Sequence, residues 1–321
     1  MDGSKSKYIS YSDENLKEMK SIQIFKGFEK EINSIDFFED GNFLVASSKD
    51  DSICFYSVPN LELIKKLYNK TYGCENAVFT HNKDAILCSS NKDFRIMYWN
   101  IYSNEVLYSF LGHSDLIIDI TMCPKSDLFL TTSRDKTSRL WDLGDKKCLA
   151  IFHESNFATF DKSGVVIASV NFINGANNLN LYDEKNIKNG PFQVFKIDST
   201  SVVRQLRFSN DGTIILCNTE DNLVIAIDSY DGNVLKKITA ELSSNNDIIP
   251  RIDISPDSKY VCSGTESGNI VIWNLQNEKI VESFEFHPLP TMYVKFNPVY
   301  NIIASACQNI VLWQINDVST K

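Results

Sequence analysis

The sequence of 321 residues predicts an all-β fold of seven similar units, each built from four short strands, that close into a ring. The first observation is that all four tryptophans end alternating segments of one kind, such as "TSRDKTSRLW". The second is that three weaker copies of this segment fill the gaps. The seven anchors are Tyr56, Trp99, Trp141, Tyr182, Ile227, Trp273 and Trp313, with neighbours 40 to 46 residues apart. Such a period is typical of a β-propeller with seven blades.

Each repeat has the same internal order of strands and turns. In the third repeat, "LIIDITMCP" is followed by a turn at "PKSD", then by "LFLTTS", a tight turn at "RDKT", and "SRLWDL". Alternation with a period of two, interrupted by turn residues, indicates short antiparallel strands. Other repeats turn at 39–42, 210–213 and 255–258, where Asp-Gly or Pro-Asp suits a tight hairpin. The fourth repeat, at about 150–190, is the most degenerate, with "NFINGANNLN" in place of a clean turn.

The two ends of the chain suggest how the ring closes. Residues 1–20 form a polar lead in which "SDENLKEMK" predicts a short helix capped by Ser12 or Asp13, and residues 21–321 form the single propeller. The sequence ends eight residues after Trp313, too soon for a fourth strand in the last blade. The segment "SIQIFKG" at 21–27 precedes the first blade and has no blade of its own. We therefore expect this N-terminal strand to complete blade seven, which removes exposed sheet edges.

The pairs Gly112-His113 and Trp141-Asp142 are landmarks of the WD-repeat class of propellers, which the sequence resembles. The resemblance implies a hydrogen-bonded tetrad in the third blade, made of His113, Ser133, Asp135 and Trp141. Such a ring would let buried polar groups satisfy one another. Several repeats depart from the pattern, because Tyr56, Tyr182 and Ile227 replace tryptophan.

Composition narrows the function. The formal charge of −9 argues against direct nucleic-acid binding, and no apolar stretch approaches the roughly twenty residues that cross a bilayer. The start, "MDGSKSKYIS", lacks the apolar core of a secretory signal. The eight cysteines form no CxxC pair, and they are interpreted as small buried hydrophobic residues. The four histidines are far apart, and known catalytic motifs are absent. We expect no enzyme activity, no metal and no cofactor.

The residues beside the tight turns are the candidates for partner binding. The position just before the turn aspartate is Lys49, Lys92 and Arg134 in the first three repeats. The equivalent residues are Glu220 and Glu266 in repeats five and six. The functional hypothesis is a basic patch that captures an acidic or phosphorylated peptide, and the alternative is a random draw from a charged surface. Phe94, beside Asp93, is either an interface anchor or a side chain tucked against the neighbouring blade.

Phrases outside the repeat landmarks point to one subfamily. "INSIDFFEDGNFLVASSKDDSICFY", "YGCENAVFTHNKDAILCSSNKD" and "NGPFQVFK" resemble the small WD-repeat subunit of COMPASS-type (Set-family) histone methyltransferase complexes, as do "LRFSNDGTIILCNT" and "VKFNPVYNIIASAC". That subunit also occurs in cleavage-and-polyadenylation and protein-phosphatase complexes. The resemblance implies a non-catalytic nuclear adaptor, monomeric alone, that links such complexes to phosphorylated RNA polymerase II.

Other classes fit less well. A ubiquitin-ligase substrate receptor would be expected to carry arginine two residues after Asp142, where the chain has Gly144. A G-protein β-like subunit would need a long N-terminal coiled coil, which twenty polar residues cannot provide. A generic WD-repeat adaptor of another complex stays the main alternative.

Overall fold

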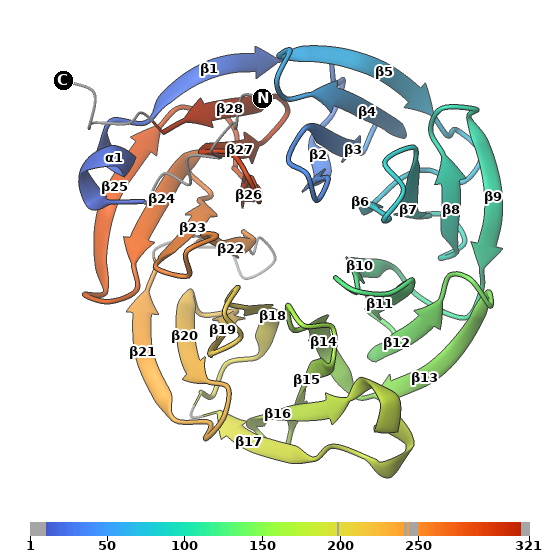
Figure 1. Cartoon of the computed structure of the whole chain (residues 1–321), viewed down its shortest axis with the longest axis vertical. Coiled ribbons are helices and arrows are strands. Elements are labelled where there is room, and N and C mark those ends of the chain that lie inside the picture. The colour runs from blue at the N-terminus through green and yellow to red at the C-terminus, as the bar shows by residue number, and fades with distance from the viewer. Residues whose placement is uncertain (1–10, 198, 241–242, 244–249, 316–321) are drawn as a thin grey trace, which may run out of the picture.

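The computed structural model describes residues 11–197, 199–240, 243 and 250–315, which form a ring of seven four-stranded antiparallel sheets (Figure 1). In each blade the first strand lies nearest the centre of the ring and the fourth forms the rim. The predicted seven-bladed propeller is confirmed.

In blades 1 to 6 the four strands follow one another in chain order, whereas blade 7 takes its outer strand from near the N-terminus. Blade 1 consists of β2 (Ile32–Phe37), β3 (Phe43–Ser48), β4 (Ser52–Ser57) and β5 (Glu62–Tyr68). Blade 2 consists of β6 (Ala77–Phe79), β7 (Ala85–Ser89), β8 (Ile96–Asn100) and β9 (Glu105–Phe110). Blade 3 consists of β10 (Ile117–Met122), β11 (Leu128–Ser133), β12 (Thr137–Asp142) and β13 (Lys147–His153). Blade 4 consists of β14 (Ser155–Phe160), β15 (Val166–Ile173), β16 (Ala176–Asp183) and β17 (Gln193–Ile197). Blade 5 consists of β18 (Val203–Phe208), β19 (Ile214–Thr219), β20 (Leu223–Asp228) and β21 (Val234–Thr239). A 3-10 helix, η1 (Glu184–Asn189), joins β16 to β17. Blade 6 consists of β22 (Ile252–Ile254), β23 (Tyr260–Gly264), β24 (Asn269–Asn274) and β25 (Lys279–Glu285). Blade 7 consists of β26 (Tyr293–Phe296), β27 (Ile302–Ala306), β28 (Ile310–Gln314) and β1 (Lys20–Phe25).

Hydrophobic side chains fill the spaces between neighbouring blades. The buried residues form seven clusters, one for each contact between successive sheets around the ring. The second strand of a blade is covered on both faces, so β7 ("AILCS") and β11 ("LFLTTS") are buried at every residue. The rim strand β5 is mostly exposed or half-buried. This difference explains why apolar alternation is weakest where each repeat ends.

The ring closes in blade 7 by pairing the two ends of the chain. Strand β1 runs antiparallel to β28, with Lys20 opposite Gln314 and Phe25 opposite Ile310. The register shifts between Ser21 and Gln23. The expected closing strand is therefore present, and it gives β28 a neighbour on its outer side.

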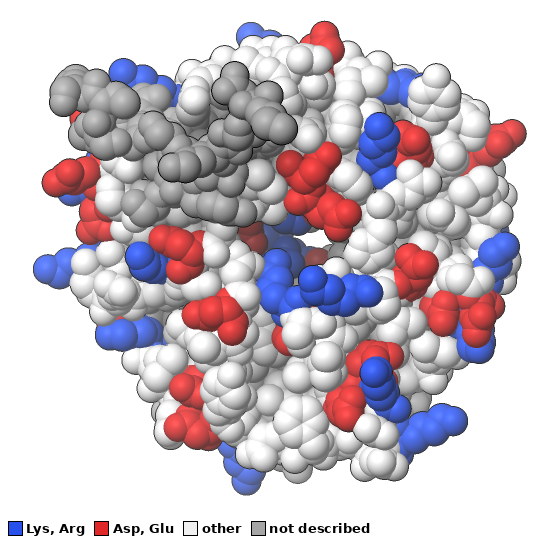
Figure 2. Space-filling view, viewed as in Figure 1, with Lys and Arg blue, Asp and Glu red and all other residues white. Residues whose placement is uncertain are grey.

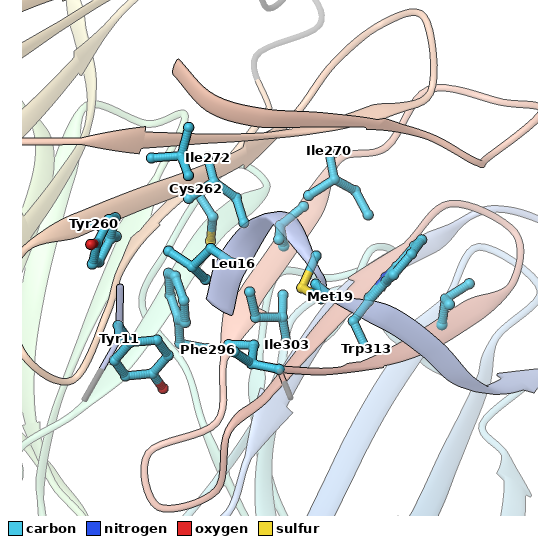
Figure 3. Close-up of a cluster of buried hydrophobic side chains, with 14 residues drawn as sticks. Tyr11, Leu16, Met19, Tyr260, Cys262, Ile270, Ile272, Phe296, Ile303 and Trp313 are labelled. Atoms are coloured by element: carbon cyan, nitrogen blue, oxygen red, sulfur yellow. The ribbon is translucent and has the colours of Figure 1, made fainter. Parts of the chain in front are cut away.

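Residues 11–19, which we call the N-terminal strap, pack onto the core between blades 6 and 7 (Figure 3). The strap contains a short helix, α1 (Asp13–Lys17), whose first turn is capped by the Ser12 hydroxyl, which accepts from the Asn15 N–H at 3.2 Å. Leu16 is fully buried, and Tyr11 and Met19 nearly so. The segment that sequence patterning describes only as polar thus carries three apolar anchors, too widely spaced to form a visible pattern.

A carboxylate fixes the same strap from its polar side. The Asp13 carboxylate accepts hydrogen bonds from the Tyr260 hydroxyl and from the Asn274 side-chain amide, both at 2.9 Å. Both donors belong to blade 6, so α1 is attached to that blade as well as to blade 7.

Blade 4 is more regular than its sequence suggests. Strands β15 and β16 form the longest hairpin of the described residues, paired from Val166–Asp183 to Ile173–Ala176. The turn consists of Asn174 and Gly175, both with positive φ, at 53° and 77°. Asn-Gly is the preferred pair for a two-residue hairpin with this backbone shape. The expectation of a degenerate turn in this repeat was wrong, because the aspartate-containing pattern is replaced by an equally strong turn signal.

Two further findings concern the chain as a whole. No helix in the described part is long and apolar enough to span a membrane. None of the eight cysteines forms a disulfide, and all except the exposed Cys148 are buried. Seven of them therefore occupy the packing role expected from the sequence.

Candidate partner-binding face

One face of the ring carries all the tight turns. Because successive strands of a blade are antiparallel, the turns between second and third strands lie on the same side as the connections from one blade to the next. We call this side the tight-turn face. The turns between first and second strands, and between third and fourth, lie on the opposite face.

The tight turns of blades 1, 2, 3, 5 and 6 each have a single residue with positive φ, and these residues are Asp51, Phe94, Lys136, Asn222 and Gly268. Blade 4 differs, because its turn has two residues, Asn174 and Gly175, and both have positive φ. Residues other than glycine rarely adopt this conformation, and a phenylalanine is unusual there. Blade 7 has a shorter turn in which the Cys307 N–H donates to the Asn309 carbonyl at 3.1 Å. Five of the turns therefore share this backbone feature, and the turns of blades 4 and 7 differ from it.

A hydrogen-bonded chain of side chains supports the tight turn of blade 3. His113 Nδ1 contacts Asp135 Oδ2 at 2.8 Å, and its Nε2 contacts the Thr131 hydroxyl at 2.7 Å. The Trp141 indole N–H donates to the same hydroxyl at 2.8 Å. Three members of the expected tetrad are present in it, but the bridging hydroxyl belongs to Thr131.

Ser133 has a different role from the one expected. Its hydroxyl donates to the Asp115 carbonyl at 2.9 Å and accepts the Asp135 N–H at 3.1 Å, so it shapes the loop and the turn. Thr131 and Ser133 lie two apart on β11 and so face the same side, which is why alternation alone could not choose between them. Thr131 lies near the indole because Phe129, two residues before it, pairs with Trp141.

The surroundings of Asp135 in this group of hydrogen-bonded side chains favour its ionised form. Burial would raise the pKa of Asp135, but bonds from the Thr137 hydroxyl, His113 and the Ser114 N–H lower it to about 2. Burial lowers the pKa of His113, and Asp135 acts in the opposite direction. The carboxylate at the turn is therefore committed to holding the loop and is not free to act as an acid or base.

A second hydrogen-bonded chain of side chains of this kind lies in blade 7, where the sequence predicted no complete tetrad. His287 Nε2 contacts the Ser305 hydroxyl at 2.7 Å, and the Trp313 indole N–H donates to it at 2.9 Å. Cys307 takes the place of the aspartate, with its sulfur 3.1 Å from His287 Nδ1. Burial lowers the pKa of His287 to about 4. The sequence did contain the signal for this arrangement, namely His287 and Trp313. The shorter turn of blade 7 places the hydroxyl residue, Ser305, two residues closer to the tryptophan along the chain than Thr131 is in blade 3.

The three candidate cations on the tight-turn face differ in how far they are engaged. Lys49 Nζ donates to Glu31 at 2.5 Å, with both side chains about half exposed. Lys92 Nζ donates to the Lys70 carbonyl. Arg134 is exposed, and within the described residues its guanidinium has no hydrogen bond or ion pair. Arg134 is therefore the cation with most capacity for a new partner.

An acidic residue that sequence reasoning missed lies among these cations. Burial raises the pKa of Glu75, while the Asn91 amide and the charges of Lys49 and Arg134 act to lower it. Asn91 Nδ2 donates to Glu75 Oε1 at 3.4 Å. In the axial view of Figure 2, basic and acidic side chains are likewise interspersed around the ring. Glu75 lies two residues before the inner strand of blade 2, and that position was the signal available in the sequence.

Phe94 is half-buried and has a φ of 59°. Its aromatic ring is therefore partly accessible at the tip of the blade 2 turn. The next residue, Arg95, bonds to Asp93 at 2.6 Å through Nε and lies over the Tyr72 ring at 4.1 Å. These contacts hold the turn in place around Phe94.

The expected acidic residues of the opposite sector are also engaged. Glu220 forms an ion pair with Arg204. Glu266 accepts a hydrogen bond from the Ser243 hydroxyl at 3.1 Å. The two sectors of the face therefore differ less in net charge than the turn residues alone suggest.

Within the described residues, no group of three or more His, Cys, Asp or Glu side chains is arranged to hold a metal ion. His81 Nε2 lies 3.0 Å from the Cys123 carbonyl and 3.1 Å from that of Ser126, so it links blade 2 to blade 3. His153 is an exposed residue at the end of β13.

Comparison with known proteins places this geometry in context. The family model described as "WD domain, G-beta repeat" matches residues 19–57, 104–142 and 236–274. Each match spans the fourth strand of one blade and the first three strands of the next. The match at 19–57 includes β1, the strand that the sheet topology places at the outer edge of blade 7.

Three relatives align along most of the chain. WD repeat-containing protein 82 of Drosophila melanogaster is 34% identical over 314 residues, covering 95% of this chain and 97% of the fly protein. COMPASS component SWD2 of Saccharomyces cerevisiae is 30% identical over 326 residues, covering 94% of this chain and 97% of the yeast protein. Set1 complex component swd2 of Schizosaccharomyces pombe is 27% identical over 310 residues, covering 89% and 86%. The similarity thus extends through all seven blades and beyond the repeat landmarks.

Proposed function

We propose that this chain, which belongs to the WD-repeat family that includes WD repeat-containing protein 82 and the COMPASS component SWD2, is a non-catalytic adaptor subunit of a Set1/COMPASS-type histone methyltransferase complex. The observation that carries the proposal is the similarity over nearly the whole length of both chains. A propeller used only as a generic scaffold would share the repeat landmarks but not the segments between them. The proposed place of action is the nucleus, and the proposed partners are the other protein subunits of such a complex.

The fold supports an adaptor role. Seven blades display loops on two faces, and the tight turns of five blades each have a single residue with positive φ. The buried imidazoles and the Asp135 carboxylate are held by structural bonds, so the polar groups in the described residues account for architecture rather than for turnover. Function in such a protein depends on surfaces carried by loops on a rigid scaffold.

A finer part of the proposal concerns the tight-turn face of blades 1 to 3. Arg134, Lys92 and Phe94 form a candidate site for a phosphorylated peptide, such as the tail of RNA polymerase II, with Lys49 at its edge. An exposed guanidinium without a partner suits bidentate binding of a phosphate. The nearby Glu75 would disfavour simple acidic peptides. A partner role in RNA 3'-end processing rests on the subfamily resemblance alone.

Affinity purification of the tagged chain from nuclear extract, with mass spectrometry of the partners, tests the main proposal. Recovery of a Set-family methyltransferase with its other subunits is the expected result. Recovery of polyadenylation or phosphatase subunits alone would move the chain to the second branch of the family. A set of cytoplasmic partners without any of these would overturn the proposed function.

Fluorescence anisotropy with a phosphorylated polymerase-tail peptide tests the finer proposal. The variant Lys49→Ala/Lys92→Ala/Arg134→Ala is compared with Lys125→Ala/Lys185→Ala/Lys279→Ala, which removes the same charge from the opposite face. The first variant is expected to weaken binding by about tenfold or more, since charge-assisted hydrogen bonds are lost. The Arg134→Ala variant alone should lose more peptide affinity than the Lys49→Ala variant, because Lys49 already bonds to Glu31. Equal affinities for the two triple variants would exclude this site.

A further inference from the structure

The connection between the third and fourth strands of blade 4 is longer than its counterparts. In blades 1, 2, 3, 5 and 6 these strands are joined by four or five residues, for example 143–146 in blade 3. In blade 4, β16 ends at Asp183 and β17 begins at Gln193, so nine residues join them. This connection contains η1 and can be followed at the rim of the ring in Figure 1. Long connections on a rigid scaffold often carry binding residues, and the tight-turn face does not use this one.

Local contacts fix the shape of this connection. The Asp183 carboxylate caps η1 by accepting from the Lys185 N–H at 2.9 Å and from the Asn186 side-chain amide at 2.6 Å. Ile187 packs against the core between blades 3 and 4, and its carbonyl accepts from the Gly190 N–H at 3.0 Å. A surface that is already ordered loses less conformational entropy when a partner binds.

Two apolar side chains at the end of this connection face solvent. Phe195, on β17, is buried in the core between blades 4 and 5. Because side chains alternate along a strand, Val194 faces away from blade 5. Phe192, two residues before Val194, is held beside β16, since its N–H donates to the Leu181 carbonyl at 2.9 Å. The Phe192 and Val194 side chains are 58% and 48% exposed, and no described strand pairs with the outer edge of β17.

The charged side chains around this apolar pair are basic. The segment 185–196 contains three lysines and no aspartate or glutamate, in a chain with a formal charge of −9; the lysines are Lys185, Lys188 and Lys196. All three are exposed, and their ammonium groups have no hydrogen bond or ion pair with any described residue. Asp183 and Glu184 directly precede the segment, and the Asp183 carboxylate is already bonded within η1. The segment therefore has cations available for a partner.

An exposed aromatic ring beside unpaired cations suits a ligand that is both acidic and apolar. Carboxylates of the ligand can pair with Lys188 and Lys196, while an apolar side chain removes Phe192 from water. A second copy of this chain is not suited, because two such surfaces would bring their lysines together. A nucleic acid is disfavoured by the small number of cations and by the negative charge of the chain. Charge complementarity thus favours an acidic segment of a different protein.

We propose that Lys188, Phe192, Val194 and Lys196 form a docking surface for an acidic segment of a partner protein, with an apolar side chain of that segment on Phe192. Connections between third and fourth strands lie on the face opposite to the tight turns, so this surface is separate from the candidate peptide site. An adaptor with both surfaces can hold two partners at once. The inference does not depend on the complex that the chain joins.

Fluorescence anisotropy with the full chain tests the apolar part of this proposal. The probe is a synthetic peptide of about eight residues that alternates leucine with glutamate, and the reference peptide has lysine in place of glutamate. Saturable binding of the acidic peptide alone is expected. Phe192→Ala is expected to weaken this binding by about tenfold or more. Tyr230→Ala is the matched control, because Tyr230 is a 77% exposed aromatic residue in the corresponding connection of blade 5.

A second pair of variants tests the charged part. Lys188→Ala/Lys196→Ala is expected to weaken binding of the acidic peptide by about fivefold and to make it less sensitive to salt. Lys125→Ala/Lys279→Ala removes two exposed lysines from blades 3 and 6 and should leave binding unchanged. All four variants change exposed side chains and should melt at the wild-type temperature.

Each outcome decides the question. The proposal is wrong if the acidic peptide does not bind, if both peptides bind equally, or if Phe192→Ala and Tyr230→Ala have the same effect. A single-stranded RNA that binds in place of the acidic peptide, with the same sensitivity to Phe192→Ala, would assign the surface to nucleic acid and overturn the proposal. Sedimentation of the chain alone tests self-association, and a dimer that Phe192→Ala abolishes would likewise overturn it.

Discussion

Blades 3 and 7 contain the same His–hydroxyl–Trp arrangement but complete it differently. In blade 3 the imidazole faces the Asp135 carboxylate, which offsets part of the effect of burial on the histidine. In blade 7 it faces the Cys307 sulfur, and burial alone lowers the pKa of His287 to about 4. A hydroxyl that joins an indole to an imidazole is thus the shared element, and the aspartate is a replaceable part.

The two blades also differ in how they are assembled. Blade 3 is one continuous segment, whereas blade 7 combines β26 to β28 with β1 and is covered by the N-terminal strap. Both blades contain the polar arrangement, so the difference between them lies in the apolar contacts of the strap. The closing blade requires additional apolar contacts from the other end of the chain.

Removing an anchor of the strap should have the largest effect. Leu16→Ala is expected to lower the free energy of unfolding by about 2–4 kcal/mol, because Leu16 is fully buried in the core between blades 6 and 7. Chemical denaturation measures the change. Leu149→Ala on the rim of blade 3, where the leucine is 40% exposed, should cost less than about 1 kcal/mol. Similar losses for both variants would show that the strap does not stabilise blade 7.

Removing the Thr131 hydroxyl of blade 3, which His113 and Trp141 share, should have the second largest effect on the free energy of unfolding. Thr131→Val keeps the shape of the side chain but leaves the His113 Nε2 and the Trp141 N–H without their partner. We expect a loss of about 2–3 kcal/mol in the free energy of unfolding. Ser133→Ala serves as the matched control and should cost about 1 kcal/mol. A larger loss for Ser133→Ala would restore the tetrad expected from the sequence.

Acidification should destabilise blade 7 through His287. Its pKa in the folded chain is about 4, against an ordinary value of 6.5, so the unfolded chain binds the proton more readily. The contribution is complete above pH 6.5 and is lost progressively as the pH falls toward 4, to a total of about 2–3 kcal/mol. His287→Gln should flatten the stability curve in this range relative to the wild type. NMR titration of the imidazole provides an independent check, and an ordinary pKa there would refute the prediction.

The smallest effect is expected where blade 7 departs from blade 3. Cys307→Ser keeps a polar atom beside the His287 Nδ1 and should change the free energy of unfolding by less than about 1 kcal/mol. Asp135→Asn in blade 3 should cost about 1–2 kcal/mol, because the carboxylate accepts from the Ser114 and Thr137 N–H groups as well as His113. Thermal melting of both variants under one buffer condition measures the difference. Equal losses would mean that the aspartate and the cysteine are interchangeable.

The sequence was sufficient for the architecture because its repeats are regular. The spacing of the tryptophan slots, the turn signals and the unpaired strand near the N-terminus together predicted seven blades and their closure. Asn174 and Gly175 show a limit of that approach, since a turn that departs from the family pattern was taken for degeneracy although its chemistry favours a hairpin.

The candidate site was less accessible to sequence reasoning. Side chains two apart on a strand are equivalent by alternation, so Ser133 and Thr131 could be separated only by the cross-strand position of Trp141. The environment of Arg134 depends on Glu75, which comes from the neighbouring blade and is distant in sequence.

The pairing of β1 with β28 has a consequence for synthesis on the ribosome. Among the described residues, β1 is the first strand to be synthesised and its partner β28 is the last. Until β28 has been made, the nascent chain exposes the unpaired edge of β1, with Phe25 and the apolar anchors of the strap uncovered. Blade 7 is therefore completed in one late docking event, and a cell that makes this protein has reason to shield the strap and β1 until β28 has been synthesised.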